Sequence, residues 1–172
     1  MALVLRRTAL FLAIVAIFAL LAAIVAQAAT SRAVVRFEGF APGTIVVKTH
    51  ERHLYYVLGS ERALRFPVGV GKAGMQWTGV ARVEGKFIEP AWRAPPTINH
   101  GALGPVIAGG NPHNPMGAAA LTLRGGEYAI HGTNDPASIG RFVSHGCIRM
   151  YNHDISELFA LVSVGTPVIV EQ

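Results

Sequence analysis

Residues 44–71, TIVVKTHERHLYYVLGSERALRFPVGVG, contain three runs of β-branched and aromatic residues separated by short turns. Such runs are typical of β-strands. Four more runs of this kind follow, at residues 80–88, 119–123, 128–132 and 166–171. Strand after strand at this spacing predicts a mainly β fold, either a sandwich or a barrel.

One helix is predicted directly after the last loop of the chain. Its apolar residues recur at the spacing of one helical face: Ile155, Leu158, Phe159 and Val162. Asp154 is the expected N-terminal cap, and Gly165 marks the end. Residues 89–116 are rich in Pro, Gly and Asn and predict long loops, which in a compact domain usually serve a function.

The first 28 residues have the layout of an export segment. Arg6 and Arg7 precede 18 consecutive apolar residues, 9–26, and small residues stand where a signal peptidase would cut after Ala28. The apolar stretch is also long enough to span a bilayer, so a cleaved signal peptide and an uncleaved membrane anchor both stay open. In either case we expect residues 29–172 to form a single exported domain, with its core at about 43–171, in the periplasm or cell-wall space.

The charge of the chain narrows the possible partners. Loss of Arg6 and Arg7 with the signal would lower the formal net charge from +5 to +3. The remaining basic residues form no runs, so the sequence does not indicate a nucleic-acid-binding protein. A mildly basic domain suits acidic material outside the cytoplasm.

The chain has one cysteine, Cys147, within SHGCIRM at residues 144–150. A single cysteine forms no intramolecular disulfide, so in an exported protein it either pairs with another chain or stays reactive. A thiol becomes a nucleophile when a histidine lies within hydrogen-bond reach. Spacing does not exclude His145, but His131 at a strand end is the better base. The HGC sequence instead predicts a turn whose backbone N–H groups converge, as an oxyanion hole requires.

The stretch IHGTNDPASIGRFVSHGCIRMYN, residues 130–152, resembles the signature of the L,D-transpeptidase catalytic domain, the YkuD-like family. In that signature a His-Gly pair precedes Ser/Thr-His-Gly-Cys. Other segments stand in the family's order: GTIVVKTHERHLYYVLG, FPVGVGK, PAWRAPP, NPMGAAALTL and GTPVIV. The sequence departs from the family at QWTGVARV, where many members have a proline before the glycine.

The resemblance implies a β-sandwich of mixed sheets with one short helix after the cysteine motif. It implies that Cys147 is the nucleophile and His131 the general acid and base, with the ring oriented by the backbone carbonyl of Gly132. The other implied site residues form the oxyanion hole and shape the pocket: Ser144, His145, Gly146 and Arg149. Arg149 would meet a substrate carboxylate. The implied chemistry needs no metal and no cofactor.

The implied function is that of a peptidoglycan L,D-transpeptidase. The Cys147 thiolate would cut the L,D bond of a tetrapeptide stem, release D-alanine and pass the acyl group to an amine. The implied partners are peptidoglycan stem peptides. If the N-terminal segment stays uncleaved, it would also bind the protein to the membrane. We expect a monomer. The acceptor stays open between another stem peptide, a lipoprotein, a D-amino acid and water. The family also predicts acylation of Cys147 by carbapenem-type β-lactams.

Several alternatives stand beside this interpretation. With water as acceptor, the same site would be that of an L,D-carboxypeptidase. An amidase-like hydrolase on the same scaffold is a second alternative. A third is a wall-binding module without catalytic activity. Zinc binding by His131, His145 and Cys147 uses legitimate ligands, although the spacing matches no familiar zinc pattern. Trp77 and Trp92 adjoin loops, where contact with a substrate groove and packing are both open.

Overall fold

The computed structural model describes residues 32–125 and 128–172, and the export segment expected at residues 1–28 lies outside them. Within the described part, no helix has the length and apolar character needed to cross a membrane. The elements follow one another as β1 (Ala33–Arg36), β2 (Ile45–Lys48), β3 (His53–Gly59), β4 (Arg62–Pro67), β5 (Val70–Gly71), β6 (Gly79–Ile88), β7 (Trp92–Arg93), β8 (Val106–Ile107), β9 (Ala119–Leu123), β10 (Ala129–His131), the 3-10 helix η1 (Pro136–Ser138), β11 (Phe142–Ser144), β12 (Ile148–Arg149), α2 (Asn152–Leu161) and β13 (Pro167–Glu171).

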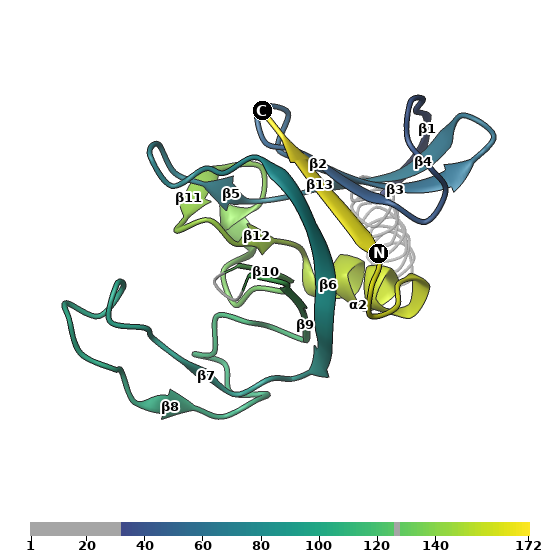
Figure 1. Cartoon of the computed structure of the whole chain (residues 1–172). Coiled ribbons are helices and arrows are strands. Elements are labelled where there is room, and N and C mark those ends of the chain that lie inside the picture. Colours follow the sequence, from purple (N-terminus) through teal and green to yellow (C-terminus); the bar gives the residue numbers. More distant parts are fainter. Residues whose placement is uncertain (1–31, 126–127) are drawn as a thin grey trace, which may run out of the picture. The chain divides into compact units, whose positions relative to one another are not determined.

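Strand β6 joins two halves of one nine-stranded sheet, ordered β1-β4-β3-β2-β13-β6-β9-β10-β12. Residues 79–82 of β6 pair with β13, and residues 83–88 pair with β9. The register shifts between Val83 and Gly85, and such a shift bends a strand. Figure 1 shows β6 curving from its place beside β13 towards β9. A single long strand therefore carries the chain from one half of the sheet to the other.

The prediction of a mainly β fold with mixed sheets and one helix is confirmed. The β13–β2 and β10–β12 pairs are parallel, and the other pairs of the large sheet are antiparallel. Every run predicted as a strand contains one, within a few residues at each end. The short strands β1, β7, β8, β11 and β12 were not predicted, because so few residues produce no alternating pattern.

Both halves of the sheet and the helix contribute to one hydrophobic core. Its largest fully buried members include residues from β2–β4, from β9, β10 and β12, and from α2: Ile45, Leu54, Phe66, Leu121, Ile130, Ile148, Ile155 and Leu158. Each such side chain contributes about 1.5–3 kcal/mol when it is taken out of water. The strands that carry the cysteine and histidine motifs are thus anchored in the same core as the rest of the domain.

Helix α2 begins directly after β12, as predicted, but its start differs from the expectation. Tyr151, in an extended conformation, occupies the N-cap without a side-chain hydrogen bond, and the helix begins at Asn152. Asp154 therefore lies inside the first turn, where it is 1% exposed, and the prediction that it caps the helix is wrong. The first turn begins earlier than the apolar periodicity indicates, because polar Asn152 and His153 precede the buried stripe.

The C-terminal end of α2 is held by a lysine on β6. Lys86 Nζ on β6 donates to Phe159 O over 2.7 Å and to Val162 O over 2.6 Å. The same ammonium lies 4.3 Å from the centroid of the Phe159 ring. A positive charge at the last carbonyls of a helix satisfies orphan acceptors and favours the helix dipole.

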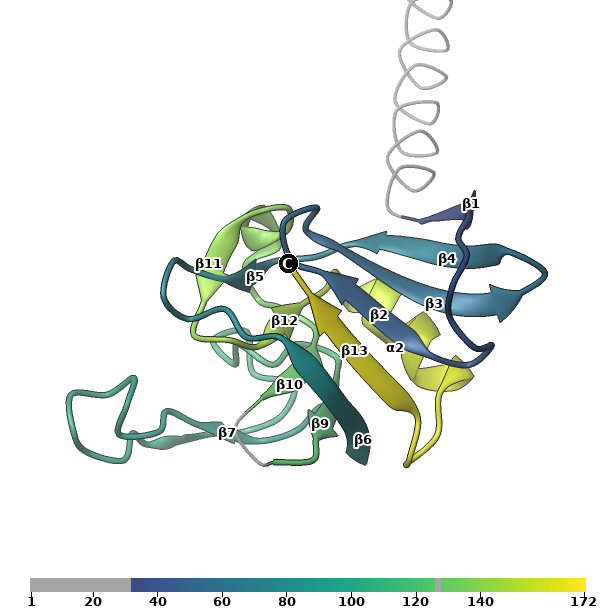
Figure 2. The same ribbon diagram turned by 45° about the horizontal axis from the view of Figure 1, so that its top comes forward.

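The predicted loop region forms an arm, residues 89–117, that leaves the sheet at the end of β6 (Figures 1 and 2). Its only ladder within the described residues is the two-residue β7–β8 pair. Asn114, 2% exposed, fixes the base of the arm because its amide donates to the carbonyls of Pro90, Ile107 and Ala108. This buried amide thus ties the start of the arm to its returning end.

Replacing Lys86 by Met should lower the free energy of unfolding by about 1–3 kcal/mol, because two hydrogen bonds from a charged donor are lost. Urea unfolding measures the change. The matched control is Lys48→Met, which removes a surface pair with Glu51 at 3.7 Å and a contact with the Phe37 ring at 5.4 Å, and should cost under about 1 kcal/mol. Equal losses in the two variants would contradict the capping role of Lys86.

Candidate active site

The cysteine motif is held between two parallel strand pairs. β11, which ends at Ser144, pairs with β5, and β12, which follows Cys147, pairs with β10. Arg149 and Gly69 also exchange backbone hydrogen bonds, of 2.8 and 2.9 Å. The chain between Ser144 and Ile148 is therefore a short turn with both ends fixed to the sheet.

Ser144 organises the inside of this turn. Its hydroxyl donates to Cys147 O over 2.6 Å and accepts from Gly146 N over 3.1 Å, and the residue is 2% exposed. Gly146 has φ +122°, a conformation that favours glycine, and a Cβ built there would lie 2.3 Å from Cε1 of Tyr128. The sequence therefore needs serine and glycine at these two positions for the turn itself.

His131 lies at the end of β10, in register with Arg149 on β12. Its Nδ1 is 2.6 Å from Gly132 O. A carbonyl only accepts hydrogen bonds, so Nδ1 carries the proton and Nε2 of the neutral ring presents a lone pair. The expectation that the Gly132 carbonyl orients the ring therefore agrees with this contact.

Burial keeps His131 neutral. The residue is 5% exposed, and its pKa is lowered to about 4. Desolvation is the largest cause and the charge of Arg149 acts in the same direction, whereas the carbonyls of Gly132 and Pro115 oppose the shift. At neutral pH the imidazole is thus unprotonated and free to act as a base.

Cys147 is half-buried in the same region. Burial raises the pKa of its thiol above the ordinary 9.0, although the backbone of Ala129 and the charge of Arg149 act in the opposite direction. Within residues 32–125 and 128–172 no hydrogen bond joins Cys147 Sγ to the His131 ring. The resting site therefore holds a thiol and a neutral imidazole, and catalytic contacts of this kind often tighten only when substrate binds.

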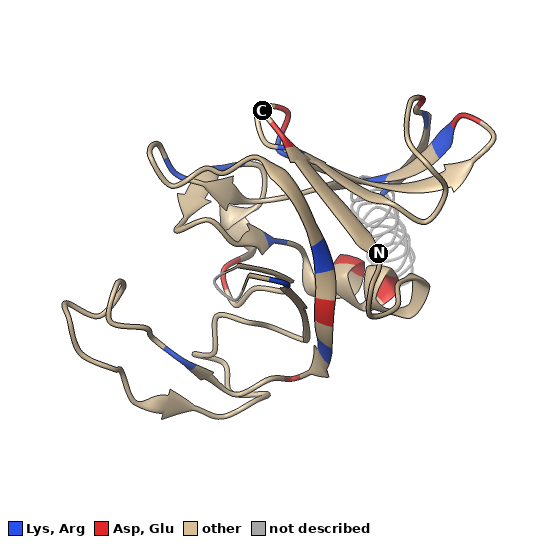
Figure 3. Cartoon of the chain, in the orientation of Figure 1, with Lys and Arg blue, Asp and Glu red and all other residues tan. Residues whose placement is uncertain are grey.

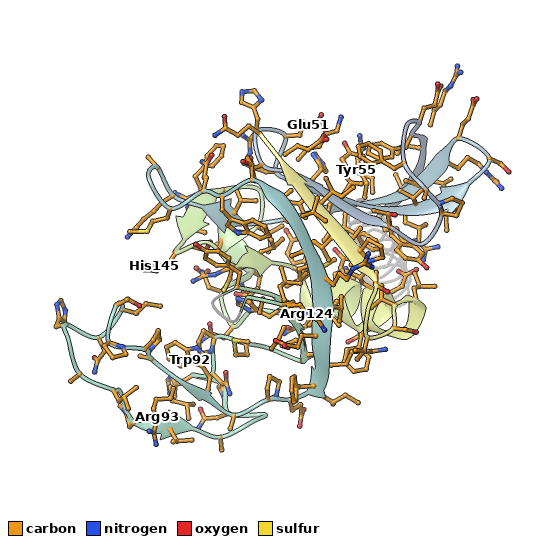
Figure 4. The ribbon with its side chains drawn as sticks, viewed as in Figure 1. Glu51, Tyr55, Trp92, Arg93, Arg124 and His145 are labelled. Atoms are coloured by element: carbon orange, nitrogen blue, oxygen red, sulfur yellow. The ribbon has the colours of Figure 1, made fainter. Side chains whose placement is uncertain are left out.

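Basic side chains flank the turn. Figure 3 shows Lys and Arg on β12 and on the connection from β5 to β6, where Arg149 and Lys72 lie. Lys72 Nζ is 3.2 Å from Nε2 of His145, and the nearby charges of Lys72 and Arg149 add to desolvation in lowering the pKa of His145. A neutral His145 ring accepts from the ammonium. His145 is exposed and lies on the arm side of the turn (Figure 4).

Arg149 has its Nε buried with no hydrogen-bond acceptor among the described residues. A guanidinium with an unused donor in a half-buried position is suited to an anionic group such as a carboxylate.

Sequence reasoning missed Asn152 and gave Trp77 no definite role. Asn152 Oδ1 accepts from Ala118 N over 3.1 Å and from Thr133 N over 3.0 Å, and so ties the loop after His131 to the end of the arm. Trp77 Nε1 donates to Gly146 O over 3.0 Å. The only indication of Asn152 in the sequence was its place as the last residue of the quoted signature. Trp77 gave no such indication, because it lies 69 positions before Gly146, the residue to which it donates.

A cavity of about 270 Å³ adjoins the loop after His131 rather than the thiol. Its lining includes Glu89, Asn111, Thr133 and Asn152, but not Cys147. Among the described residues, no three His, Cys, Asp or Glu side chains are grouped so that they could hold a metal ion, which leaves the zinc alternative without support from the geometry.

The sequence of this chain matches that of a known protein family. The family model described as the L,D-transpeptidase catalytic domain matches residues 42–170. The chain belongs to this family. The predicted resemblance is therefore confirmed.

Curated relatives of this L,D-transpeptidase-family chain carry the same family name. The chain is 40% identical over 134 residues to the probable L,D-transpeptidase YbiS of Escherichia coli K12, which covers 72% of this chain and 43% of YbiS. It is 53% identical over 62 residues to the putative L,D-transpeptidase YkuD of Bacillus subtilis, covering 36% of this chain and 38% of YkuD. The chain thus spans less than half the length of these relatives.

Solved structures of the family share the fold. The catalytic domain of the Enterococcus faecium L,D-transpeptidase superposes with a TM-score of 0.60 at 23% identity, covering 78% of this chain and 100% of that domain. An L,D-transpeptidase from Mycobacterium smegmatis gives a TM-score of 0.57 at 20% identity, over 75% of this chain and 58% of that one.

The alkylation of Cys147 by iodoacetamide should be slow at neutral pH and gain most of its rate above pH 9, because burial raises the pKa of the thiol and His131 stays neutral above about pH 4. Intact-mass spectrometry measures the rate between about pH 5 and pH 10. Cys147→Ala, which should form no adduct, is the control. A rate that already reaches its plateau in mild acid would instead indicate a thiolate–imidazolium pair in the resting protein.

Proposed function

We propose that this protein is an exported L,D-transpeptidase that uses Cys147 to transfer an acyl group from a peptidoglycan stem peptide to an amine. The observation that carries the proposal is the parallel β10–β12 pair, in which the strand that ends at the neutral His131 lies beside the strand that follows the half-buried thiol. Membership of the family and the names of the curated relatives support the same reaction.

In the first step His131 Nε2 takes the proton from Cys147 while the sulfur attacks the carbonyl carbon of the third stem residue. A C–S bond forms and the carbonyl oxygen becomes an oxyanion. When the oxyanion collapses, the C–N bond to the terminal D-alanine breaks. The departing nitrogen takes the proton from the His131 imidazolium, and a thioester remains.

In the second step an amine of a neighbouring stem attacks the thioester and gives its proton to His131. The C–S bond breaks, and the sulfur takes that proton back as the thiol. Water in place of the amine makes the same site an L,D-carboxypeptidase. The two reactions share every residue of the site and differ only in the acceptor.

The backbone amides of His145 and Cys147 are the proposed donors to the oxyanion. The Gly146 amide donates to Ser144 Oγ in this structure, so we assign Ser144 and Gly146 to the shape of the turn. Arg149, with its unused Nε donor, is the proposed contact for a substrate carboxylate.

Residues 1–28 are the proposed signal peptide or membrane anchor, and residues 29–172 the exported catalytic domain, acting as a monomer in the periplasm or cell-wall space. The substrate is outside the cytoplasmic membrane, which accords with an export segment.

Incubation with disaccharide-tetrapeptide should give loss of D-alanine and formation of crosslinked dimers with the wild-type domain. Cys147→Ala should abolish both products. His131→Gln should slow them by about 10²–10⁴-fold, because the general acid and base is lost. Mass spectrometry of the products measures both reactions.

The matched control is His50→Gln, at an exposed histidine on the β2–β3 turn, which should keep the wild-type rates. Loss of D-alanine without dimers would indicate a carboxypeptidase. Absence of both products with the wild-type domain would favour a wall-binding module and contradict the proposal.

Acylation by a carbapenem provides a simpler probe of the same thiol. Among the solved structures of similar fold, one is an Enterococcus faecium catalytic domain acylated by ertapenem, and one is a Mycobacterium tuberculosis enzyme with a faropenem-derived adduct. We propose that Cys147 attacks the β-lactam carbonyl in the same way, with cleavage of the ring C–N bond and retention of the whole drug mass.

A further inference from the structure

Trp77 lies on the connection between β5 and β6, outside the cysteine motif, yet its indole reaches the peptide that precedes the thiol. Nε1 donates to Gly146 O over 3.0 Å. The indole stacks on Tyr128 with 5.0 Å between ring centroids and 6° between the planes. Tyr128 in turn lies against Gly146, since a Cβ there would meet its ring at 2.3 Å. The stacked rings of Trp77 and Tyr128 therefore both pack against Gly146 in the cysteine turn.

We infer that Trp77 is a positioning residue that aims the Cys147 N–H at the oxyanion formed during acyl transfer. The inference rests on the proposed function, because only an attack on a carbonyl creates such an oxyanion.

The argument starts from the planarity of the peptide. The Gly146–Cys147 bond is trans, as are the others in the described residues, so Gly146 C=O and Cys147 N–H point in opposite directions. An indole that holds the carbonyl on one face therefore directs the amide hydrogen to the other face. The plane of this peptide decides where the donor points.

Both carbonyls that flank the Cys147 amide are held. Trp77 holds Gly146 O, and the Ser144 hydroxyl holds Cys147 O over 2.6 Å. Gly146 is the weak point of the turn, because glycine restricts rotation of its own peptide less than any other residue. Without the indole hydrogen bond, this peptide loses the contact that fixes its orientation.

The indole hydrogen bond also acts on the strength of the donor. A hydrogen bond to the carbonyl oxygen polarises the whole amide and makes its N–H a better donor. Because the Gly146 amide is already engaged by Ser144, the Cys147 amide carries a larger share of the oxyanion contact. Trp77 thus sets both the direction and the strength of this donor.

The test compares two reactions of the same sulfur. Acylation by ertapenem passes through an oxyanion, whereas alkylation by iodoacetamide displaces iodide without one. Trp77→Phe keeps an aromatic ring on Tyr128 and removes the Nε1–H donor. We expect the acylation rate constant to fall by about 10–100-fold, somewhat less than the loss of a complete oxyanion donor, and the alkylation rate and its pH profile to stay at wild-type values.

Two further variants isolate the hydrogen bond. Trp92→Phe makes the same chemical change at the other tryptophan of the chain, on β7, and should alter neither rate. A protein with benzothienylalanine in place of Trp77 keeps the shape of the bicyclic ring and lacks only the N–H donor. It should reproduce the selective loss of acylation even if Trp77→Phe disturbs folding.

Equal losses in acylation and alkylation would overturn the inference, because Trp77 would then act on the thiol or on folding. Unchanged acylation in both Trp77 variants would overturn it as well. Failure of the wild-type protein to be acylated would instead count against the proposed function, so the two failures are distinguishable.

Discussion

The parallel pairing of β10 with β12 is the constraint on which the site depends. It places His131 in register with Arg149, two residues after the thiol, and both strands are anchored in the core through Ile130 and Ile148. Parallel strands run in the same direction, so the connection between them must cross back to the end where the first strand began. Here η1, β11 and the cysteine turn make that connection, and β5 and Gly69 fix it from the other side.

Burial of this pair has an electrostatic consequence. Desolvation lowers the pKa of the imidazole and raises the pKa of the thiol, so both groups favour their neutral forms. The charges of the proposed reaction then arise at the moment of attack, when fixed backbone donors are already in place. Ser144 and Trp77 already donate hydrogen bonds to the carbonyls of Cys147 and Gly146 in the structure without substrate. The backbone N–H groups proposed to bind the oxyanion therefore need not reorient during the reaction.

Much of this structure was predictable from the sequence, and the rest depends on contacts between distant residues. The β-branched runs predicted the long strands, because alternation over several residues is a strong local signal. The HGC motif with its upstream His-Gly pair predicted a site made of Cys147 and His131, and their catalytic roles stay a prediction. The capping role of Asp154 was wrong, because the helix begins at Asn152 and takes Asp154 inside its first turn. The role of Trp77 had no local signal, since its contact with Gly146 depends on how the β5–β6 connection folds over the turn.

The most direct test of this account is a crystal structure of the protein with an acyl group trapped on Cys147. The account predicts that the acyl carbonyl oxygen lies about 2.7–3.1 Å from the Cys147 nitrogen, with Trp77 Nε1 still bound to Gly146 O and His131 Nε2 facing the thioester. A carbonyl oxygen directed away from the Cys147 amide, towards Arg149 or solvent, would contradict it.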